Sequence, residues 1–108
     1  MPKYIMLAFN GPTGGEGDGE ALEQWYEQSH LPELKAAGAT DTARRFKVVD
    51  NNLPGKEAWP YVAVYEIEAD DMADLQRRMQ QGGGISVHPA LDRSRSATLL
   101  AVQVSGDD

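Results

Sequence analysis

Three short segments of this chain contain runs of consecutive apolar residues, so a strand formed by any of them carries apolar side chains on both faces. The segments are residues 4–9, 61–68 and 97–104. A sheet with one face in water alternates apolar and polar residues instead. Because a contiguous apolar face is not left in water, the predicted sheet must be covered on both sides. In the first segment one face would carry Ile5, Leu7 and Phe9, and the other face Tyr4, Met6 and Ala8.

A helical segment follows the first strand. The spacing of its apolar residues predicts a helix from residue 18 to about residue 30, with Asp18 as the N-cap. Pro32 lacks an N–H and restricts the residue before it, so we expect the helix to break or kink there. A further short helical turn would then end at Gly38.

The remaining segments complete the order β-α-β-β-α-β. This is the order of the ferredoxin-like fold, a four-stranded antiparallel sheet with both helices on one face. Asp70 or Asp71 would cap the second helix, whose apolar stripe is Met72, Leu75 and Met79. The other predicted segments are a strand over 42–49, a loop over 51–60, a strand over 61–68, an irregular stretch over 86–95 and a strand over 97–104.

Composition sets limits on the class of protein. A length of 108 residues predicts a single domain, residues 1–108. The 10 basic and 17 acidic residues give a net charge of −7, which argues against a nucleic-acid partner, since binding the phosphate backbone needs a basic face. The absence of cysteine excludes disulfides and thiolate chemistry. With neither a membrane-spanning apolar run nor a signal-peptide pattern, we expect a cytoplasmic protein without a membrane partner.

Two helices cover only one face of the predicted sheet. A second copy of the chain, packed sheet to sheet about a two-fold axis, would cover the other face and make a homodimer. The alternative is a long loop folded over that face. The strongest candidate, residues 82–95, carries glycines and charges, so we favour the second copy.

The segment with the sequence WYEQSHLPEL, residues 25–34, holds the candidate chemistry. Tyr26 and His30 are four residues apart and therefore share one helix face. An imidazole beside a phenol can serve as a proton acceptor next to a hydrogen-bond donor. A helix C-terminus at His30 would favour the charged imidazolium. The alternative is that His30 caps a helix or packs in the core, with Tyr26 as simple packing.

The pattern W-Y-x-x-x-H-L-P, followed later by an Arg-Phe pair, resembles the EthD-like family of the dimeric α+β barrel superfamily. The resemblance implies a homodimer whose two sheets form a barrel-like core, with a pocket in each subunit between sheet and helices near His30. Members of the superfamily include cofactor-free monooxygenases, polyketide cyclases, lactone isomerases and haem-degrading enzymes, and EthD-like proteins often accompany gene sets for the catabolism of aromatic compounds. The residues that carry the resemblance are Trp25, Tyr26, His30, Leu31, Pro32, Arg45 and Phe46.

Four further side chains are candidates for contact with a small molecule. Arg44 and Arg45 are predicted to lie on opposite faces of their strand, and Arg45 is the one that matches the family pattern. Arg45 would bind a carboxylate or phenolate of a ligand. The alternative is that it forms an ordinary surface ion pair. Trp25 and Phe46 follow from the same resemblance. His88 stands in the loop after a triple glycine, and the alternative is a solvent-exposed histidine. The histidines lack metal-ligand spacing, so a metal site is not predicted. We predict no cofactor, and haem with a ligand other than cysteine stays open as an alternative.

Two functions stay open at this point. The first is a cofactor-free enzyme that acts by acid/base chemistry on a small aromatic, phenolic or polyketide-like molecule in an apolar pocket. His30 would be the general acid/base, Tyr26 a hydrogen-bond donor and Arg45 an anchor, in a cyclase, isomerase, lyase or monooxygenase type of reaction. The second is a non-catalytic small-molecule-binding or stress-response module, in which His30 ties the first helix to the sheet. An imidazole that opens into a cavity favours the enzyme, and a sealed imidazole with both nitrogens bonded favours the module.

Overall fold

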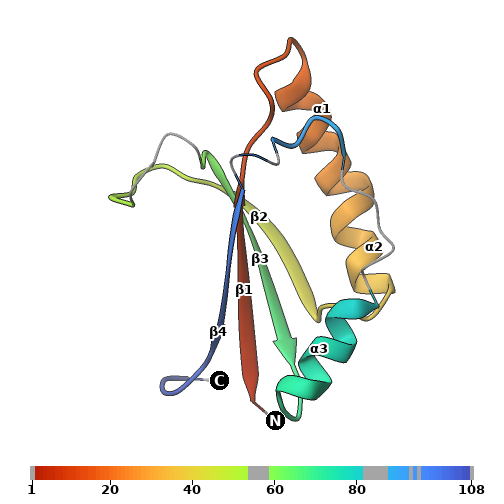
Figure 1. Ribbon diagram of the computed structural model, residues 1–108, viewed down its shortest axis with the longest axis vertical. Coiled ribbons are helices and arrows are strands. Elements are labelled where there is room, and N and C mark those ends of the chain that lie inside the picture. The colour runs from red at the N-terminus through yellow and green to blue at the C-terminus, as the bar shows by residue number, and fades with distance from the viewer. Residues whose placement is uncertain (1, 54–58, 82–87, 93, 95, 108) are drawn as a thin grey trace.

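The computed structural model describes residues 2–53, 59–81, 88–92, 94 and 96–107. They form a sheet with a layer of helices on one side (Figure 1). In chain order the elements are β1 (Lys3–Asn10), α1 (Asp18–Trp25), the π-helical turn η1 (Tyr26–His30), α2 (Leu31–Ala36), β2 (Thr42–Lys47), β3 (Tyr61–Glu68), α3 (Met72–Gln80) and β4 (Ala97–Val102).

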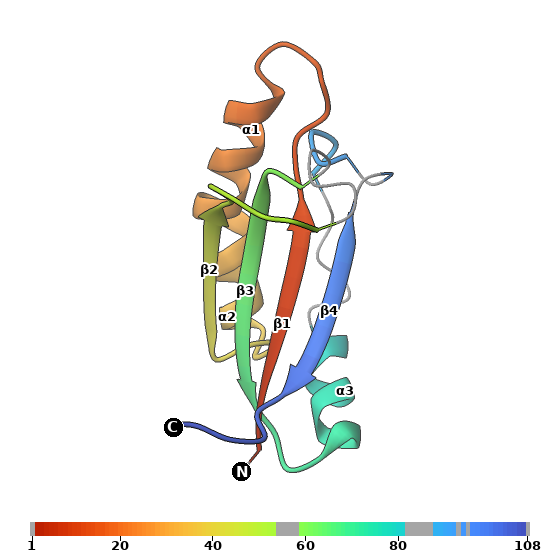
Figure 2. The ribbon, with the colours of Figure 1, turned by 90° about the vertical axis from the view of Figure 1, so that its left-hand side faces the viewer.

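The sheet has the strand order β2-β3-β1-β4, and each neighbouring pair is antiparallel. Together with helices on a single face, this confirms the predicted ferredoxin-like fold (Figures 1 and 2). The bounds of β3 agree with the prediction, whereas β2 ends two residues before residue 49. The last bond of β2 runs from the Val48 N–H to the Pro60 carbonyl, and Pro60 has no N–H with which to continue the ladder.

The last strand is also shorter than predicted, since β4 ends at Val102 rather than at residue 104. The Gln103 N–H still donates to the Lys3 carbonyl at 2.9 Å. Pro2, which comes next on the neighbouring strand, has no N–H to offer. Both shortened strands therefore end where a proline stands on the neighbouring chain segment.

The start of the first helix differs from the prediction. Asp18 is not the N-cap, because Gly17 holds that position with a φ of 78° and α1 begins at Asp18 itself. The Asp18 carboxylate accepts a hydrogen bond from the Thr13 hydroxyl, so it is turned toward the preceding loop. A glycine suits this position because a left-handed backbone costs it nothing.

Of the break or kink expected at Pro32, the break is wrong, because α1, η1 and α2 form one continuous helix that contains a π turn just before the proline (Figure 1). In η1 the Leu31 N–H bonds to the Tyr26 carbonyl, five residues back. A proline ring in a regular α-helix collides with the carbonyl four residues before it. The wider π turn just before Pro32 takes up this conflict without ending the helix, and single π turns of this kind are frequent at functional sites.

The predicted stop at Gly38 is confirmed. Its φ is 78°, its N–H donates to the Lys35 carbonyl, and the Ala39 N–H donates to the Leu34 carbonyl at 3.0 Å. These two bonds make the motif that commonly ends a helix at a glycine.

Asp71 is the N-cap of α3, as one of the two predicted alternatives, and its carboxylate accepts from the Asp74 N–H at 2.9 Å. Leu75 of this helix is fully buried against Ile67 and Tyr4 of the sheet.

A second core cluster lies between the sheet and the continuous helix formed by α1, η1 and α2. Its buried members are Leu22, Tyr26, Ala63, Tyr65 and Ala90.

No helix of the described chain covers the other face of the sheet (Figure 2), and apolar side chains of the strands lie on that face. Phe46 and Leu99 on this face are each 48% exposed. Residues 48–53, which follow β2, cross one end of the face (Figure 2), and the ring of Trp59 lies 5.8 Å from that of Phe9. Within the candidate covering loop, residues 82–87, 93 and 95 lie outside the described residues, while Ala90 and Leu91 pack on the helix side. The sheet face opposite the helices is called the open face below.

Candidate functional site

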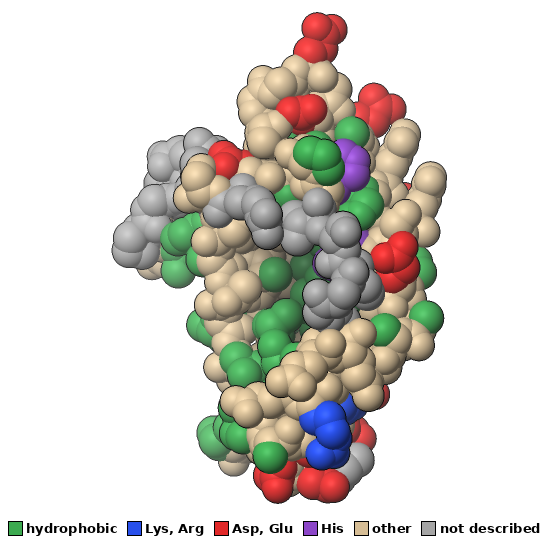
Figure 3. All heavy atoms as spheres, turned by 45° about the vertical axis from the view of Figure 1, so that its right-hand side comes forward, with side chains coloured by type: hydrophobic (Ala, Val, Ile, Leu, Met, Phe, Trp, Pro, Cys, Tyr) green, Lys and Arg blue, Asp and Glu red, His purple; other side chains and the backbone are tan. Residues whose placement is uncertain are grey.

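A pocket of about 370 Å³ lies between the helical layer and the sheet. On this side of the molecule histidine atoms reach the surface among hydrophobic side chains (Figure 3). The prediction that Trp25, Tyr26 and His30 gather at a pocket between helix and sheet agrees with this arrangement. Strand β1 contributes Met6 and Asn10 to the lining, and β3 contributes Tyr65.

The imidazole of His30 is held by rings and not by hydrogen bonds. It stacks on Trp25 with a centroid distance of 4.2 Å and an interplanar angle of 18°, and its edge faces Tyr26 at 5.2 Å. Neither ring nitrogen has a hydrogen-bond partner in the part of the chain that the structure describes, and Nδ1 is buried. The ring is therefore positioned by its aromatic neighbours, while none of the described residues bonds to either nitrogen.

His30 is neutral at pH 7, which corrects the expectation of a stabilised imidazolium. Burial lowers the pKa of His30 below its ordinary value of 6.5. The expected helix end is missing, because the chain continues through α2 as far as Ala36. The carbonyls that would have favoured a positive charge are thus used within the helix, and desolvation decides the charge state.

Tyr26 is buried and its hydroxyl is held by Asn10. The Asn10 Nδ2 donates to the Tyr26 hydroxyl at 2.7 Å, which leaves the phenol proton free to be donated elsewhere. Burial raises the pKa of Tyr26, so the group stays a protonated donor at neutral and mildly alkaline pH. Asn10 Oδ1 is buried without a partner among the described residues.

Asn10 and Tyr65 belong to the site although neither was predicted for it. Asn10 is a polar residue at the end of an apolar strand, and no motif around it in the sequence predicts a role in a site. Tyr65 is a buried phenol on the adjacent strand, and burial raises its pKa as well. Because Tyr65 stands in an apolar strand, the sequence favours a packing role for it. In the structure its ring packs in the core and also lines the pocket.

Arg45 does not line this pocket. Its guanidinium lies 4.6 Å from the Tyr26 ring centroid and 3.9 Å from that of Tyr61, with Nη1 2.5 Å from Glu23 Oε2. The side chain is only 5% exposed. The structure thus places Arg45 against the ring of a site residue, where it does not reach a ligand held beside His30.

Phe46 and His88 lie apart from the pocket lining. Phe46 lies on the open face, on the other side of the sheet. His88 Nδ1 accepts a hydrogen bond from the Ala90 N–H at 3.0 Å, which assigns its proton to Nε2. Its ring lies 5.8 Å from that of Trp25. His88 therefore supports Trp25 from outside the pocket, and the predicted direct contact with a ligand does not follow from its position.

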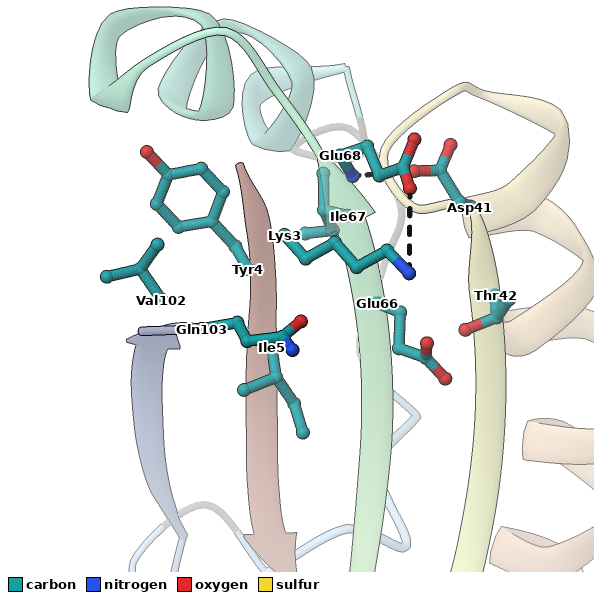
Figure 4. Close-up of a pocket in the computed structure, with 10 residues that line it drawn as sticks. All are labelled: Lys3, Tyr4, Ile5, Asp41, Thr42, Glu66, Ile67, Glu68, Val102 and Gln103. Atoms are coloured by element: carbon teal, nitrogen blue, oxygen red, sulfur yellow. Dashed lines mark hydrogen bonds and ion pairs between the residues drawn. The ribbon is translucent and has the colours of Figure 1, made fainter. Parts of the chain in front are cut away.

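A larger hollow, of about 580 Å³, lies at the other end of the sheet around the start of β1. Its charged groups face one another (Figure 4). Lys3 Nζ lies 4.0 Å from Glu68 Oε1, and the Glu68 N–H donates to Asp41 Oδ2 at 2.7 Å. Arg44 pairs with Glu66 at 2.9 Å. Because these charges satisfy one another, the smaller pocket with uncommitted groups is the better candidate for chemistry.

Among the described residues no three histidine or carboxylate side chains come together as a metal-binding group. Within the same ranges, no helix has the length and apolarity to span a bilayer.

Comparison with known proteins supports the fold alone. No protein-family model matches the chain. No curated protein matches it either. Among solved structures, it is similar to a dimeric ferredoxin-like protein of unknown function from Jannaschia sp. CCS1, with a TM-score of 0.56 and 18% sequence identity. The similarity covers 92% of this chain and 97% of that one.

Proposed function

We propose that the pocket between helix and sheet binds a small aromatic or phenolic molecule, and that His30 transfers a proton to or from it. The observation that carries this proposal is the state of His30, a neutral imidazole in the pocket wall with no hydrogen bond to either nitrogen among the described residues. A histidine with a structural role would have its nitrogens bonded, because leaving a buried polar atom unpaired costs about 1–3 kcal/mol.

The neighbouring groups suit a proton transfer. Trp25 stacks on one face of the His30 ring, and the apolar side chains Met6, Ala8 and Leu91 line the same pocket, so an aromatic ring can lie against them. As a neutral base His30 would take a proton from a phenol or from a carbon next to a carbonyl. The Tyr26 phenol, held by Asn10, would donate to the oxygen on which negative charge develops. A single donor of this kind contributes on the order of 10²–10³ in rate.

This assignment uses only side chains of the chain itself, in keeping with the proposed cofactor-free chemistry. The resemblance of residues 25–32 to EthD-like proteins supports an aromatic or polyketide-like substrate. Cyclisation, isomerisation, lyase and oxygenation reactions of such molecules can all begin with the same proton transfer, so the proposal concerns the shared step.

The open face is proposed to pack against a second copy of the chain. Apolar side chains of β1, β3 and β4 on this face lack a covering helix, and the similar structure from Jannaschia is described as dimeric. Native mass spectrometry should report twice the mass of one chain. A monomer at micromolar concentration would count against the pairing of the two open faces.

The test of the proposed reaction is hydrogen–deuterium exchange into aromatic ketones. The protein is incubated in deuterated buffer with para-hydroxyacetophenone and with bicyclic phenolic ketones, and exchange next to the carbonyl is followed by NMR. Exchange should be accelerated by the native protein and lost in His30→Gln. His88→Gln is the matched control and should retain most of the acceleration. Ligands that bind without any accelerated exchange would point to the non-catalytic binding module instead.

A further inference from the structure

A second, smaller cavity of about 130 Å³ adjoins the pocket that holds His30. The two cavities share three lining residues, Met6, Leu34 and Tyr65. The smaller one extends away from His30, toward the end of α2 and the face of α3. Its own lining residues are Ala39, Thr40, Ile67 and Met79.

Among the described residues, the smaller cavity offers a ligand no uncommitted polar group of its own. Of the described lining residues that it does not share, only Thr40 is polar, and the Thr40 hydroxyl is directed at the carbonyls of Thr42, at 2.6 Å, and Glu66, at 3.0 Å. A water molecule needs two to four polar partners to be stable in a cavity. An enclosed engineered cavity of about 150 Å³ with an apolar lining binds benzene, so a space of about 130 Å³ is close to the size that such a group needs. A short alkyl chain or a phenyl ring therefore suits this space.

The polar groups lie at the opposite end. Asn10, Tyr26 and His30 line the pocket of about 370 Å³, and none of them lines the smaller cavity. The combined space has one polar end with a proton acceptor and one apolar end. The residue between them on β1, Met6, is unbranched and flexible, so it can adjust to a chain that passes from one cavity to the other.

We infer that the ligand is an aromatic molecule with an apolar substituent, whose ring lies at Trp25 and His30 and whose substituent fills the cavity lined by Ala39 and Met79. This inference rests on the proposed function and adds the shape of the molecule to it. Each methylene that enters the cavity should raise the affinity about fourfold, and the gain should stop once the cavity is full.

The probes are phenol, para-ethylphenol and para-butylphenol, and binding is measured by titration calorimetry. The native protein should bind them in rising order of affinity. Ala39→Leu fills the smaller cavity from a buried position, so it should keep phenol binding and lose most of the gain from the butyl chain. Ala36→Leu, at an exposed position in the last turn of α2, three residues before Ala39, is the matched control and should leave the series unchanged.

Met79→Ala is a second variant, which enlarges the cavity and does not depend on the folding of Ala39→Leu. It should extend the gain in affinity to chains longer than butyl. Equal affinity for all three phenols, with phenol binding lost in His30→Gln, would overturn the inferred substituent while leaving the proposed function in place. Absence of binding by the whole series would overturn both.

Discussion

The proposed role of His30 in proton transfer can be tested separately from its contribution to the stability of the fold. Replacing it by phenylalanine keeps a flat ring against Trp25 and removes the buried Nδ1 that lacks a partner in the described chain. We expect His30→Phe to unfold at the same temperature as the native protein or a few degrees above it, since an unpaired buried group costs about 1–3 kcal/mol. The same variant should lose the accelerated deuterium exchange. Thermal denaturation followed by circular dichroism is the measurement.

The control for that variant is His88→Phe. His88 Nδ1 accepts a hydrogen bond from the Ala90 N–H, so its loss leaves a half-buried donor unpaired. This variant should unfold at a lower temperature than the native protein. If His30→Phe were the one to melt several degrees lower, the site histidine would be structural, as in the alternative of a binding module.

The lowered pKa of His30 gives a pH dependence with a definite sign. Unfolding releases the histidine to water, where its pKa returns to about 6.5. Between the lowered folded pKa and 6.5 the unfolded chain binds more protons, so stability rises with pH through this window and is fully present above it. Urea titrations at a series of pH values should show this rise in the native protein. The rise should be smaller in His30→Phe, and an identical profile would contradict the assigned shift.

At the scale of elements, α3 is held to the rest of the chain by one arginine in addition to its apolar face. Arg78 donates to the Gly38 carbonyl at 2.9 Å and to the Glu68 carbonyl at 2.8 Å, and it pairs with Asp41 at 2.9 Å. It therefore joins α3 to the end of α2 and to the strands β2 and β3. The pairing also lowers the pKa of Asp41.

Replacing Arg78 by methionine should lower the free energy of unfolding by about 1–2 kcal/mol, because the carbonyls of Gly38 and Glu68 and the carboxylate of Asp41 each lose a side-chain donor. Urea unfolding provides the measurement. The neighbouring Arg77 pairs with Asp74 on the exposed surface, and its side chain is 68% exposed. Arg77→Met is thus the matched control, with an expected change within about 0.5 kcal/mol. Equal effects at the two positions would rule out this bridging role for Arg78.

At the scale of the whole molecule, two adjacent leucines test the proposed dimer. Leu99 lies on the open face beside Leu7, while Leu100 is paired with Met6 on the helix side. The two side chains are similarly exposed, at 48% and 41%. A lysine at position 99 would place a charge in the interface, whereas a lysine at position 100 would not. Leu99→Lys should therefore give a monomer in native mass spectrometry, and Leu100→Lys should stay dimeric.

The reverse result, a monomer from Leu100→Lys alone, would place the interface on the helix side. An interface on the helix side would also cover the mouth of the pocket with the second copy of the chain. Dissociation by Leu99→Lys should leave the helix-side pocket intact, so retained exchange activity in that variant would show that each copy carries a complete site.

Local patterns were enough to predict most of the fold. The runs of apolar residues predict the strands, and Asp71 and Gly38 mark helix ends because a cap or a left-handed backbone depends on a few adjacent residues. The predicted break at Pro32 is wrong, because the irregularity there is a π turn inside a continuous helix. A proline disfavours a regular helix, but packing of Tyr26 and Leu22 beneath the helix favours its continuation, and the π turn satisfies both.

What the sequence by itself determined is the order of elements, the apolar character of both sheet faces, and the pairing of Tyr26 with His30 on one helix. These depend on periods of two and 3.6 residues, which neighbouring residues set. The tertiary structure alone decided that Asn10 holds Tyr26, that Arg45 lies against Tyr26 and Tyr61, that Phe46 lies on the open face, and that burial keeps His30 neutral. The physical reason is that contacts, burial and pKa depend on which segments distant in the chain are brought together, and the local periods do not record this.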